Sequence, residues 1–467
     1  MKLGVCVPYR NREEHLNTFV PRVGKHLKEQ GIDFCMYFAH QTDDKLFNRG
    51  ATKNIAAKHA IEDGCDYVVF HDIDMIPESG TDYSYPKDNP IHLATQISQM
   101  DYELKYHEYF GGAVLFTKEQ LEATNGYSND YWDWGMEDDD LFWRCHLEGM
   151  TNDDYLDVPF KSKKYIRFNG EDSWARIPKS RELKNITAKS HTISVLTRAF
   201  QQPDKNPIFL IGAKDKKYVE YPILRIPGYD YGISFNNSRA LSLQYWNTFN
   251  QHNYMWLKRY DNQWSWVTVV IDEESNKSHF YLNGTEVDSK AGFGSQSPWN
   301  FTGKLKAYGL KDIFLGVTPS LDEGDTGKYF KGDIADIKIW NRALSPIEVK
   351  GIHKESPLEG LTYKWNTEEL DKFNCEVVNE EIKVPNSIVP YRRKGRFTCL
   401  PHKDEGLVDG KWSKGETTAR NERRYVLQMQ QGKWNYKEDG IKQVQYELIN
   451  VENLTPWAKM LNIKILP

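Results

Sequence analysis

The first 160 residues alternate short apolar runs with amphipathic stretches, and this alternation narrows the folds that the chain can adopt. The runs LGVCVPY, DFCMYFAH, DYVVFHDIDMIP and YFGGAVLFT are typical of strands, and residues 11–30, 48–63, 118–126 and 139–148 have the spacing of helices. Strands that alternate with helices pack as a layered α/β fold with a largely parallel sheet. Ligands of such sheets bind beyond the carboxyl ends of the strands, where the third strand of this chain has its acidic residues.

The pattern changes near residue 163, where strand-like runs follow one another without helices. HTISVLTRAF, PIFLIGA, YGISFNN, WSWVTVVID and SHFYLNGTEV alternate apolar and polar residues, and Asn-Gly or Gly-Asp turns occur between such runs. This texture favours a β-sandwich that ends near residue 355. Residues 357–384 have no clear pattern, and the chain is mixed again from about residue 385, with a helix-like stretch at 418–430.

The charges are nearly balanced, with 61 Lys and Arg against 66 Asp and Glu and a net charge of −5. This balance gives no electrostatic case for nucleic acid or an anionic membrane as a partner. The chain has no signal-peptide pattern and no apolar run long enough for a membrane span. Its six cysteines are scattered without a CxxC pair. We therefore expect reduced thiols, no membrane span and a cytoplasmic location.

Two carboxylates follow the third strand-like run, in HDIDMIP. If the strand continues through them, Asp72 and Asp74 lie on the same face, because alternate residues of a strand share a face. Close carboxylates favour a cation between them, and a metal–nucleotide complex would supply one. An acidic turn at the end of a strand explains the spacing equally well.

Basic and aromatic residues follow the first two strand-like runs. Arg10 and Arg12 stand in VPYRNREEH, and Phe47 and Arg49 stand in FNRG. Arginine binds phosphate through paired donors, and an aromatic ring can stack on a base. Solvated arginines at a helix start remain the more common explanation of such a pattern.

The stretch YWDWGMEDDD combines flat aromatic rings with four consecutive acids. Trp132 and Trp134 have apolar faces that suit a sugar ring, and Glu137 and Asp138 are suited to orienting and deprotonating a hydroxyl group. Asp140 could instead cap the helix that follows. A capped helix with tryptophans in the core accounts for some of these acids, but not for all four.

A cysteine and a histidine lie three residues apart in CLPHKDEG. Cys399 and His402 have side chains that ligate transition metals, and a carboxylate from elsewhere would complete a site. Such a pair is weak evidence by itself.

Taken in order, these stretches resemble the β-1,4-galactosyltransferase family. The resemblance rests on VPYRNREEHL, FNRG, HDIDMIP and YFGGAVLFTKEQLEATNGYSNDYWDWGMEDDD, and downstream on GRFTCLPH, NERRY and DGIKQVQYEL. The middle of the chain resembles laminin-G-like and concanavalin-A-like sandwiches through YIRFNGEDSWARIP, WVTVVID, FYLNGTEV and GDIADIKIWNRALSPIEV.

The two resemblances imply a discontinuous transferase domain with an all-β insert. We expect an α/β nucleotide-sugar transferase (GT-A-like) domain formed by residues 1–160 and 385–467, a jelly-roll sandwich at 161–356 and a connecting segment at 357–384. Such an insertion is plausible because the two ends of a sandwich can lie close together.

The resemblance also implies a role for individual residues in a metal-dependent, inverting transfer from a UDP-sugar. Asp138 would be the general base with Glu137 beside it, and Asp74, His402 and Cys399 would bind Mn²⁺ or another divalent metal. The donor nucleotide would contact Pro8, Tyr9, Arg10, Arg12, Phe47, Arg49, Asp72 and Ile73. The sugars and the acceptor would contact Tyr109, Gly111, Gly112, Trp134, Asp139, Arg424 and Tyr425.

Three positions depart from the family pattern. Asp133 stands where the family often has glycine, and we expect a stiffer loop there. Cys399 stands where many members have methionine, so zinc or cobalt could compete with manganese. Tyr9 in place of phenylalanine is a mild change.

The predicted activity is the transfer of galactose, or a related hexose, to a hydroxyl of an acceptor glycan. A glycan that ends in N-acetylglucosamine is one candidate acceptor. The sandwich would bind a glycan or a partner; its acidic loop SLDEGDTG could hold Ca²⁺, although a solvated turn is favoured. Trp246, Trp256, Trp264 and Trp266 are predicted to be core residues. The alternative is a non-catalytic carbohydrate-binding or structural protein that keeps the transferase scaffold.

Overall fold

The chain forms two compact units that are built from discontinuous segments. The computed structural model describes residues 1–104, 109–158, 162–199, 206–211, 231–235, 240–246, 252–258, 263–287, 298–300, 305, 313–318, 328–401, 407–408, 411–412, 421 and 435–466. Unit 1 comprises Met1–Asp153, Ser387–Gln428 and Gly432–Pro467, and unit 2 comprises Asp154–Asn386 and Met429–Gln431.

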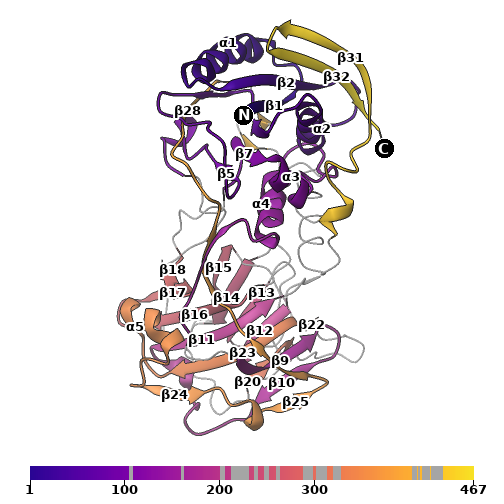
Figure 1. The fold of residues 1–467 in the computed structure, drawn as a ribbon. Coiled ribbons are helices and arrows are strands. Elements are labelled where there is room, and N and C mark those ends of the chain that lie inside the picture. The colour runs from indigo at the N-terminus through magenta and orange to yellow at the C-terminus, as the bar shows by residue number, and fades with distance from the viewer. Residues whose placement is uncertain are drawn as a thin grey trace. The chain divides into compact units, whose positions relative to one another are not determined.

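Unit 1 contains a seven-stranded sheet in the order β31-β32-β2-β1-β3-β7-β5 (Figure 1). Its four central strands, β32, β2, β1 and β3, are parallel, whereas β31, β7 and β5 at the edges run antiparallel to their neighbours. The predicted parallel sheet is therefore confirmed for the centre only. The sheet strands are β1 (Lys2–Tyr9), β2 (Asp33–Gln41), β3 (Tyr67–His71), β5 (Ile91–His92), β7 (Ala113–Thr117), β31 (Tyr446–Thr455) and β32 (Ala458–Ile465).

Helices cover the two faces of this sheet. Alternate residues of β1 point to opposite faces: Val5 packs in one apolar core with Phe19 of α1 (Glu13–Glu29), and Cys6 packs in another with Ile55 of α2 (Arg49–Glu62). α3 (Lys118–Thr124) and α4 (Glu137–Leu147) follow β7. Strand–helix alternation thus produces the layered α/β fold that the sequence predicts.

A small sheet links the two chain segments of unit 1. Its order is β4-β28-β6, from β4 (Met75–Pro77), β28 (Arg396–Cys399) and β6 (Gln96–Ile97). Cys399 is the register partner of Met75, so the downstream segment lies directly beside the HDID turn. The chain leaves unit 1 through β8 (Asn152–Tyr155) and returns through β27 (Pro385–Val389), and these two strands pair.

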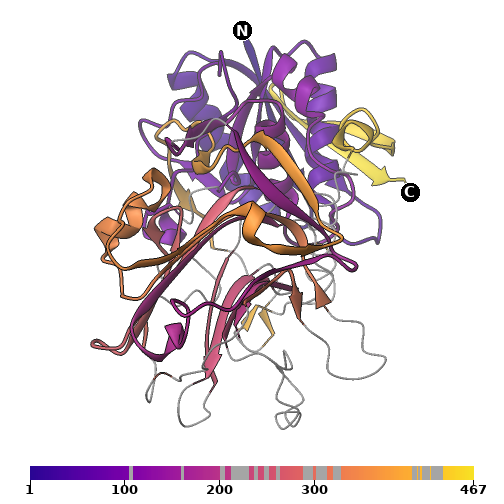
Figure 2. The same ribbon diagram turned by 90° about the horizontal axis from the view of Figure 1, so that it is seen from below.

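Unit 2 contains two antiparallel sheets around an apolar core (Figure 2). The seven-stranded sheet has the order β15-β14-β13-β12-β20-β10-β25, and the nine-stranded sheet has the order β18-β17-β16-β11-β23-β9-β26. The strands of the first are β10 (Trp174–Ile177), β12 (Asn206–Ile211), β13 (Tyr231–Phe235), β14 (Ala240–Trp246), β15 (His252–Lys258), β20 (Ile313–Leu315) and β25 (Asp371–Phe373). Those of the second, along this order, are β9 (Ser162–Asn169), β11 (His191–Ala199), β16 (Ser265–Asp272), β17 (Lys277–Leu282), β18 (Thr285–Glu286), β23 (Lys331–Trp340) and β26 (Glu376–Glu381). Two further strands complete the nine: β19 (Trp299–Asn300) pairs with β17, and β24 (Leu361–Lys364) pairs with β23.

The sandwich extends further along the chain than the sequence pattern indicates. Residues 357–384, predicted as a connecting segment, supply β25 to one sheet and β26 to the other, and β24 (Leu361–Lys364) pairs with β23. Trp264 and Trp266 are buried, which confirms their core assignment. The side chains of Trp246 and Trp256 and the acidic loop at 320–327 lie outside the described residues.

α4 begins two residues earlier than the sequence pattern predicts, and this corrects the role of Asp140. The N-cap of α4 is Met136, so all four acids lie in the first turn, where negative charge suits the helix dipole. Asp140 is not the cap: it is fully buried and accepts a hydrogen bond from Nε of Arg144 at 2.6 Å and one from the hydroxyl of Tyr131 at 3.1 Å.

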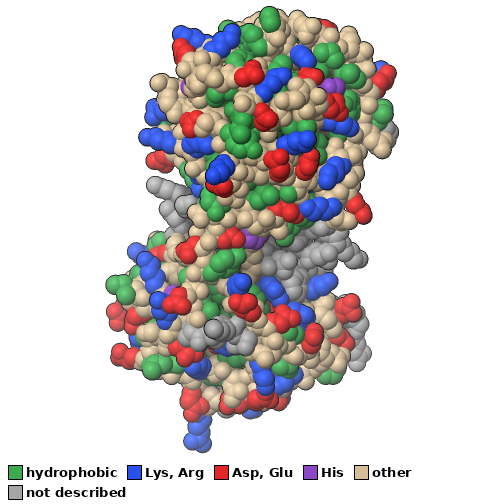
Figure 3. Space-filling view, in the orientation of Figure 1, with side chains coloured by type: hydrophobic (Ala, Val, Ile, Leu, Met, Phe, Trp, Pro, Cys, Tyr) green, Lys and Arg blue, Asp and Glu red, His purple; other side chains and the backbone are tan. Residues whose placement is uncertain are grey.

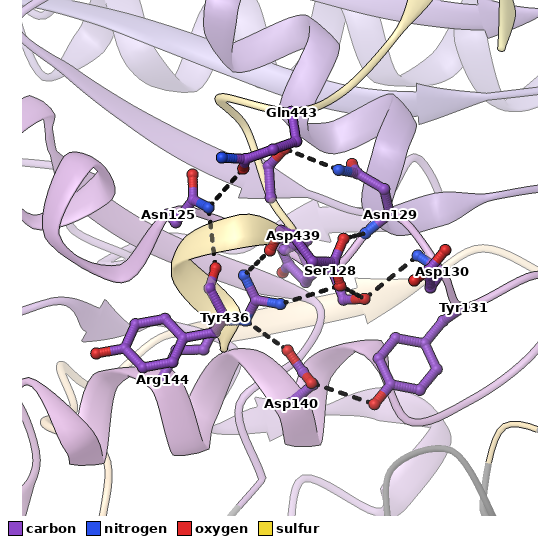
Figure 4. Close-up of polar contacts among 12 residues, drawn as sticks. Asn125, Ser128, Asn129, Asp130, Tyr131, Asp140, Arg144, Tyr436, Asp439 and Gln443 are labelled. Atoms are coloured by element: carbon purple, nitrogen blue, oxygen red, sulfur yellow. Dashed lines mark hydrogen bonds and ion pairs between the residues drawn. The ribbon is translucent and has the colours of Figure 1, made fainter. Parts of the chain in front are cut away.

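Arg144 connects α4 to the C-terminal segment (Figure 4). Its Nη1 donates to the carbonyl oxygen of Asp439 at 2.6 Å, and its Nη2 lies 3.6 Å from the Asp439 carboxylate. That carboxylate accepts hydrogen bonds from the hydroxyl of Ser128 and the backbone N–H of Asn129. The side chain of Asn125 bonds the same C-terminal segment through carbonyl oxygens of Tyr436 and Lys437. This polar network holds α4, whose first turn contains the acidic run, against the C-terminal segment.

On the face of the molecule shown in Figure 3, acidic and basic side chains are interspersed. That face therefore offers no continuous basic surface for a polyanion. Within the described part of the chain, none of the helices is long and apolar enough to span a membrane.

Replacing Arg144 with methionine should destabilise unit 1 by about 3–5 kcal/mol, because the Asp140 carboxylate would then be buried without its cation. Thermal unfolding monitored by calorimetry measures the change, with the exposed Arg22→Met as the matched control. The double variant Arg144→Met, Asp140→Leu should recover part of the loss, because it no longer buries a carboxylate at position 140 without its cation. Equal losses in the single and double variants would contradict this account of the ion pair.

Candidate active site

The acids of the HDID motif lie in a turn rather than on a strand. β3 ends at His71, and the backbone N–H of Met75 donates to the carbonyl oxygen of Asp72 at 3.2 Å. The prediction that Asp72 and Asp74 share a strand face is therefore wrong, and the two carboxylates have different neighbours. Ile73, between them, packs into the apolar core, so it can offer a nucleotide little besides its backbone.

Asp74 lies beside Cys399. The Cys399 thiol is 3.8 Å from Oδ2 of Asp74, and the backbone N–H of Leu400 donates to the Asp74 carbonyl oxygen at 2.7 Å. Burial, together with the nearby Asp74 carboxylate, raises the pKa of the Cys399 thiol to about 12. Two of the three predicted metal ligands are thus brought together by the pairing of β28 with β4. The third, His402, lies outside the described residues.

Asp72 is directed toward a buried lysine that also contacts Asp138. Nζ of Lys53 on α2 lies 3.3 Å from Oδ1 of Asp72 and 3.5 Å from Oδ1 of Asp138. Only 2% of the Lys53 side chain is exposed, whereas 25% of Asp138 and 34% of Asp72 remain accessible. The lysine is therefore the buried member of this cluster, and the two carboxylates are partly accessible to solvent.

The electrostatics of the cluster suit a proton acceptor. Burial raises the pKa of the Asp138 carboxyl to about 7, and Lys53 opposes this rise while Glu137 adds to it. Burial alone would lower the pKa of Lys53, but Asp138 and Asp72 raise it well above its ordinary value. Lys53 is therefore a permanent cation, and Asp138 can gain and lose a proton near neutral pH.

Two glycines allow the chain to pass close to Asp138. A Cβ atom on Gly111 would lie 2.4 Å from Oδ2 of Asp138, and Gly112 has a positive φ of 77°. Tyr109 lies next to both glycines, and its ring makes an edge contact with His92 at 5.1 Å between centroids. Nε2 of buried His92 lies 3.0 Å from the carbonyl oxygen of Gly111. The predicted sugar-binding residues at 109–112 thus adjoin the predicted base.

The expected nucleotide-binding residues of β1 are only partly available. Pro8 and Tyr9 are buried in the sheet, with the ring of Tyr9 against Phe38 and His40. The guanidinium of Arg10 donates to the carbonyl oxygens of Asp43 and Lys45 and so supports the loop before α2. Arg12 occupies the N-cap position of α1 without a side-chain cap bond.

The FNRG segment is tied to the loop that contains the two tryptophans. The carbonyl oxygen of Phe47 accepts from the N–H of Asp133 at 2.7 Å, and Nη1 of Arg49 donates to the Asp133 carbonyl oxygen at 2.7 Å. Asp133 has a φ of 70°, which explains why glycine suits this position in the family that the chain resembles. The side chain of Asn421 donates to the carbonyl oxygen of Trp132 at 2.9 Å and lies 3.3 Å from that of Trp134.

The remaining predicted site residues divide into three groups. The Trp134 side chain is 44% exposed and therefore accessible to a ligand. Glu137 is buried and Asp139 partly exposed, both in the first turn of α4. Arg424 and Tyr425 lie outside the described residues.

Sequence reasoning missed Lys53 and Asn421. Lys53 occurs in a helical pattern where a lysine normally indicates a solvated face, and its burial among small and apolar α2 residues has no local signal. Asn421 begins the NERRY stretch that carried part of the resemblance, but its contacts with the tryptophan loop are between segments far apart in the sequence.

Comparisons with known proteins show which families the chain is similar to. Residues 1–85 match the N-terminal region of glycosyl transferase group 7, and residues 91–171 match the N-terminal domain of galactosyltransferase. β-1,4-Galactosyltransferase 6 of Mus musculus is 35% identical over 189 residues, which cover 39% of this chain and 50% of the relative. β-1,4-Galactosyltransferase 4 of Cricetulus griseus is 39% identical over 150 residues, which cover 32% and 44%.

Over residues 1–171 the chain is similar to the β-1,4-galactosyltransferase family. It spans about half the length of the curated relatives that it matches. A solved structure of a mutant Drosophila β-1,4-galactosyltransferase 7 in complex with manganese, UDP-Gal and xylobiose is 33% identical, covers 32% of this chain and 62% of its own, and has a TM-score of 0.30. Residues 169–350 of this chain match the concanavalin A-like lectin/glucanases superfamily.

The donor atoms of this site fit a divalent transition metal. The carboxylate of Asp74 suits manganese, and the thiol of Cys399 suits softer ions such as zinc or cobalt. Among the described residues, no group of three His, Cys, Asp or Glu side chains is arranged to hold a metal, so the pair needs a further ligand. The sequence expectation that His402 supplies that ligand remains a prediction.

Replacing Gly111 with alanine should displace the Asp138 carboxylate and destabilise unit 1 by about 1–3 kcal/mol, because the new Cβ atom would overlap Oδ2. Calorimetry measures the stability, and a crystal structure of the variant shows the displacement. The double variant Gly111→Ala, Asp138→Ala removes the overlapping oxygen and should be less destabilised than the sum of the two single variants. Additive losses would show that Gly111 is not needed for the close approach.

Proposed function

We propose that this protein is a metal-dependent, inverting transferase of the β-1,4-galactosyltransferase type. It moves galactose, or a related hexose, from a UDP-sugar to a hydroxyl of an acceptor glycan that ends in N-acetylglucosamine. The observation that carries the proposal is the position of Asp138: its carboxylate approaches Gly111 on the sugar side and contacts Lys53, which also pairs with Asp72 at the donor side. The identity to curated galactosyltransferases over the same region supports the donor class.

In the proposed reaction Asp138 accepts the proton of the acceptor hydroxyl. The hydroxyl oxygen then bonds to the anomeric carbon, while the bond from that carbon to the phosphate oxygen breaks and its electron pair leaves with UDP. Attack from the face opposite the leaving group inverts the anomeric configuration. Raising the pKa of Asp138 to about 7 by burial matches the base to neutral pH.

Asp74, Cys399 and His402 are proposed to hold the metal. A divalent cation supplies charge that offsets the negative charge developing on the departing UDP. Asp74 and Cys399 approach each other because β28 pairs with β4, so the two chain segments of unit 1 must both be folded for this pair to form.

The sandwich is proposed to bind a glycan or a partner protein. Its match to a lectin-containing superfamily supports this role. We also propose a reducing compartment, because none of the six cysteines forms a disulfide. The non-catalytic alternative predicts carbohydrate binding by the full chain without release of UDP.

Asp138→Asn should lower the rate of galactose transfer at least about 100-fold, because the amide cannot accept the acceptor proton. The measurement is UDP release from UDP-galactose with an N-acetylglucosamine-terminated acceptor, with manganese and with a chelator. Glu122→Gln, an exposed change on α3, should keep the wild-type rate. If Asp138→Asn still releases UDP at the wild-type rate in the presence of metal, Asp138 is not the base. If the wild type releases no UDP from any UDP-hexose, the non-catalytic alternative is favoured.

The value of kcat/KM for the acceptor should fall as the pH drops below about 7, the pKa of Asp138. The base is active only when ionised, and burial raises its pKa above the ordinary value, so activity is present above that pH and declines about tenfold per unit below it. A pH series from 5 to 9 at saturating donor and metal tests this. An acid limb near pH 4 would contradict the buried position of the base.

A further inference from the structure

Lys53 is a charged residue in a position where apolar residues are expected. It lies on the face of α2 that packs against the sheet, together with Thr52, Ile55 and Ala56, and its side chain is buried. Taking an ammonium group out of water costs several kcal/mol unless partners compensate for it. A methionine or leucine of similar volume would fill this space without that cost.

The partners of Lys53 come from three different segments. Its Nζ lies 3.3 Å from Asp72, in the turn after β3, and 3.5 Å from Asp138, on α4. Nζ is also 3.5 Å from the hydroxyl of Tyr127 and 4.8 Å from the centroid of that ring. The Tyr127 hydroxyl donates in turn to Oδ1 of Asp138 at 3.4 Å. One ammonium group thus joins the donor side and the acceptor side of the proposed site.

The charged groups around Asp138 are otherwise acidic. Glu137, Asp72 and Asp139 all disfavour its ionised form, and the phenols Tyr127 and Tyr109 carry no charge at neutral pH. Among the charged groups described here that act on Asp138, Lys53 is the one that favours the carboxylate. Without it, burial and three neighbouring acids would keep Asp138 protonated at neutral pH.

We propose that Lys53 is a positioning residue that holds the Asp138 carboxylate ionised and aimed at the acceptor, and that couples it to Asp72 on the donor side. This inference rests on the proposed function for its kinetic consequence. The contacts themselves do not depend on which sugar is transferred. A lysine that served only to fill space would leave the ionisation of Asp138 unchanged when it was replaced.

The kinetic test compares wild type with Lys53→Met and Lys53→Arg, with Lys58→Met as a matched control elsewhere on α2. The measured quantity is kcat/KM for galactose transfer between pH 5 and 10. An opposite charge at this distance lowers a carboxyl pKa by about 1–3 units, so Lys53→Met should move the acid limb up by about 1–3 pH units. At pH 7, where the wild-type base is half ionised, this corresponds to a loss of roughly 5- to 500-fold, which should shrink as the pH rises.

Lys53→Arg keeps the charge, so its acid limb should stay within a few tenths of a unit of wild type even if the altered geometry lowers the rate. Lys58→Met should change neither the rate nor the limb. An unmoved acid limb in a folded Lys53→Met protein would overturn the proposal, and so would an equal shift in Lys53→Met and Lys53→Arg.

A second measurement separates failure of this inference from failure of the proposed function. Thermal unfolding of wild type, Lys53→Met, Asp138→Asn and the double variant is followed at pH 5 and pH 9. Burial raises the pKa of Asp138, so without the cation its ionised form carries the cost of burial at pH 9, whereas at pH 5 its carboxyl is mostly protonated with or without Lys53. Lys53→Met should therefore lower Tm more at pH 9, and this pH dependence should shrink in the Asp138→Asn background.

A wild type that transfers no sugar, combined with this pattern, would reject the transferase but keep the coupling between Lys53 and Asp138. A pH-independent loss of Tm would reject the coupling whatever the activity. Should Lys53→Met not fold, Lys53→Gln, which removes the charge and keeps a polar group, takes its place in both measurements.

Discussion

The acidic groups that give this site its chemistry repel one another, and buried cations make their assembly stable. Two chain positions supply the cations on which the arrangement depends. Lys53 lies between Asp72 and Asp138. Arg144 pairs with Asp140, which precedes it by about one turn of α4. The four acids of EDDD therefore do different things: Glu137 and Asp138 border the site, Asp139 remains partly exposed, and Asp140 anchors the helix. Both cations are buried, so loss of either would leave a poorly solvated carboxylate without its partner.

Long-range pairing completes the site. Asp74 and Cys399 are separated by a whole second unit in the chain, and they meet because β28 inserts between β4 and β6. The chain leaves and re-enters unit 1 through the paired strands β8 and β27, which allows a large insert without breaking the transferase fold. The Arg144–Asp439 contact and the Asn421 contacts act in the same way, since each joins the C-terminal part of unit 1 to the segment that carries the acids.

The sequence predicts those features that depend on local periodicity or on quoted motifs. The alternation of apolar runs identifies β1, β2, β3, α1 and α2 because each buries a regular face. It places the start of α4 too late, because four acids look like a loop although they suit the first turn of a helix. It leaves β24, β25 and β26 unassigned because these strands are short, and β25 and β26 are also largely exposed and rich in charged residues. The sequence pattern does not predict that Lys53 is buried, because its burial depends on residues after β3 and on α4 rather than on its neighbours in the helix.

The central claim is that a metal site and a base lie side by side at the end of β3. The most direct test is an anomalous-scattering map at the manganese edge from a crystal grown with Mn²⁺ and UDP. The account predicts one strong peak within coordination distance of the Asp74 carboxylate, next to Cys399 and in contact with the diphosphate. UDP density without such a peak, or a peak on the EDDD run instead, would contradict it.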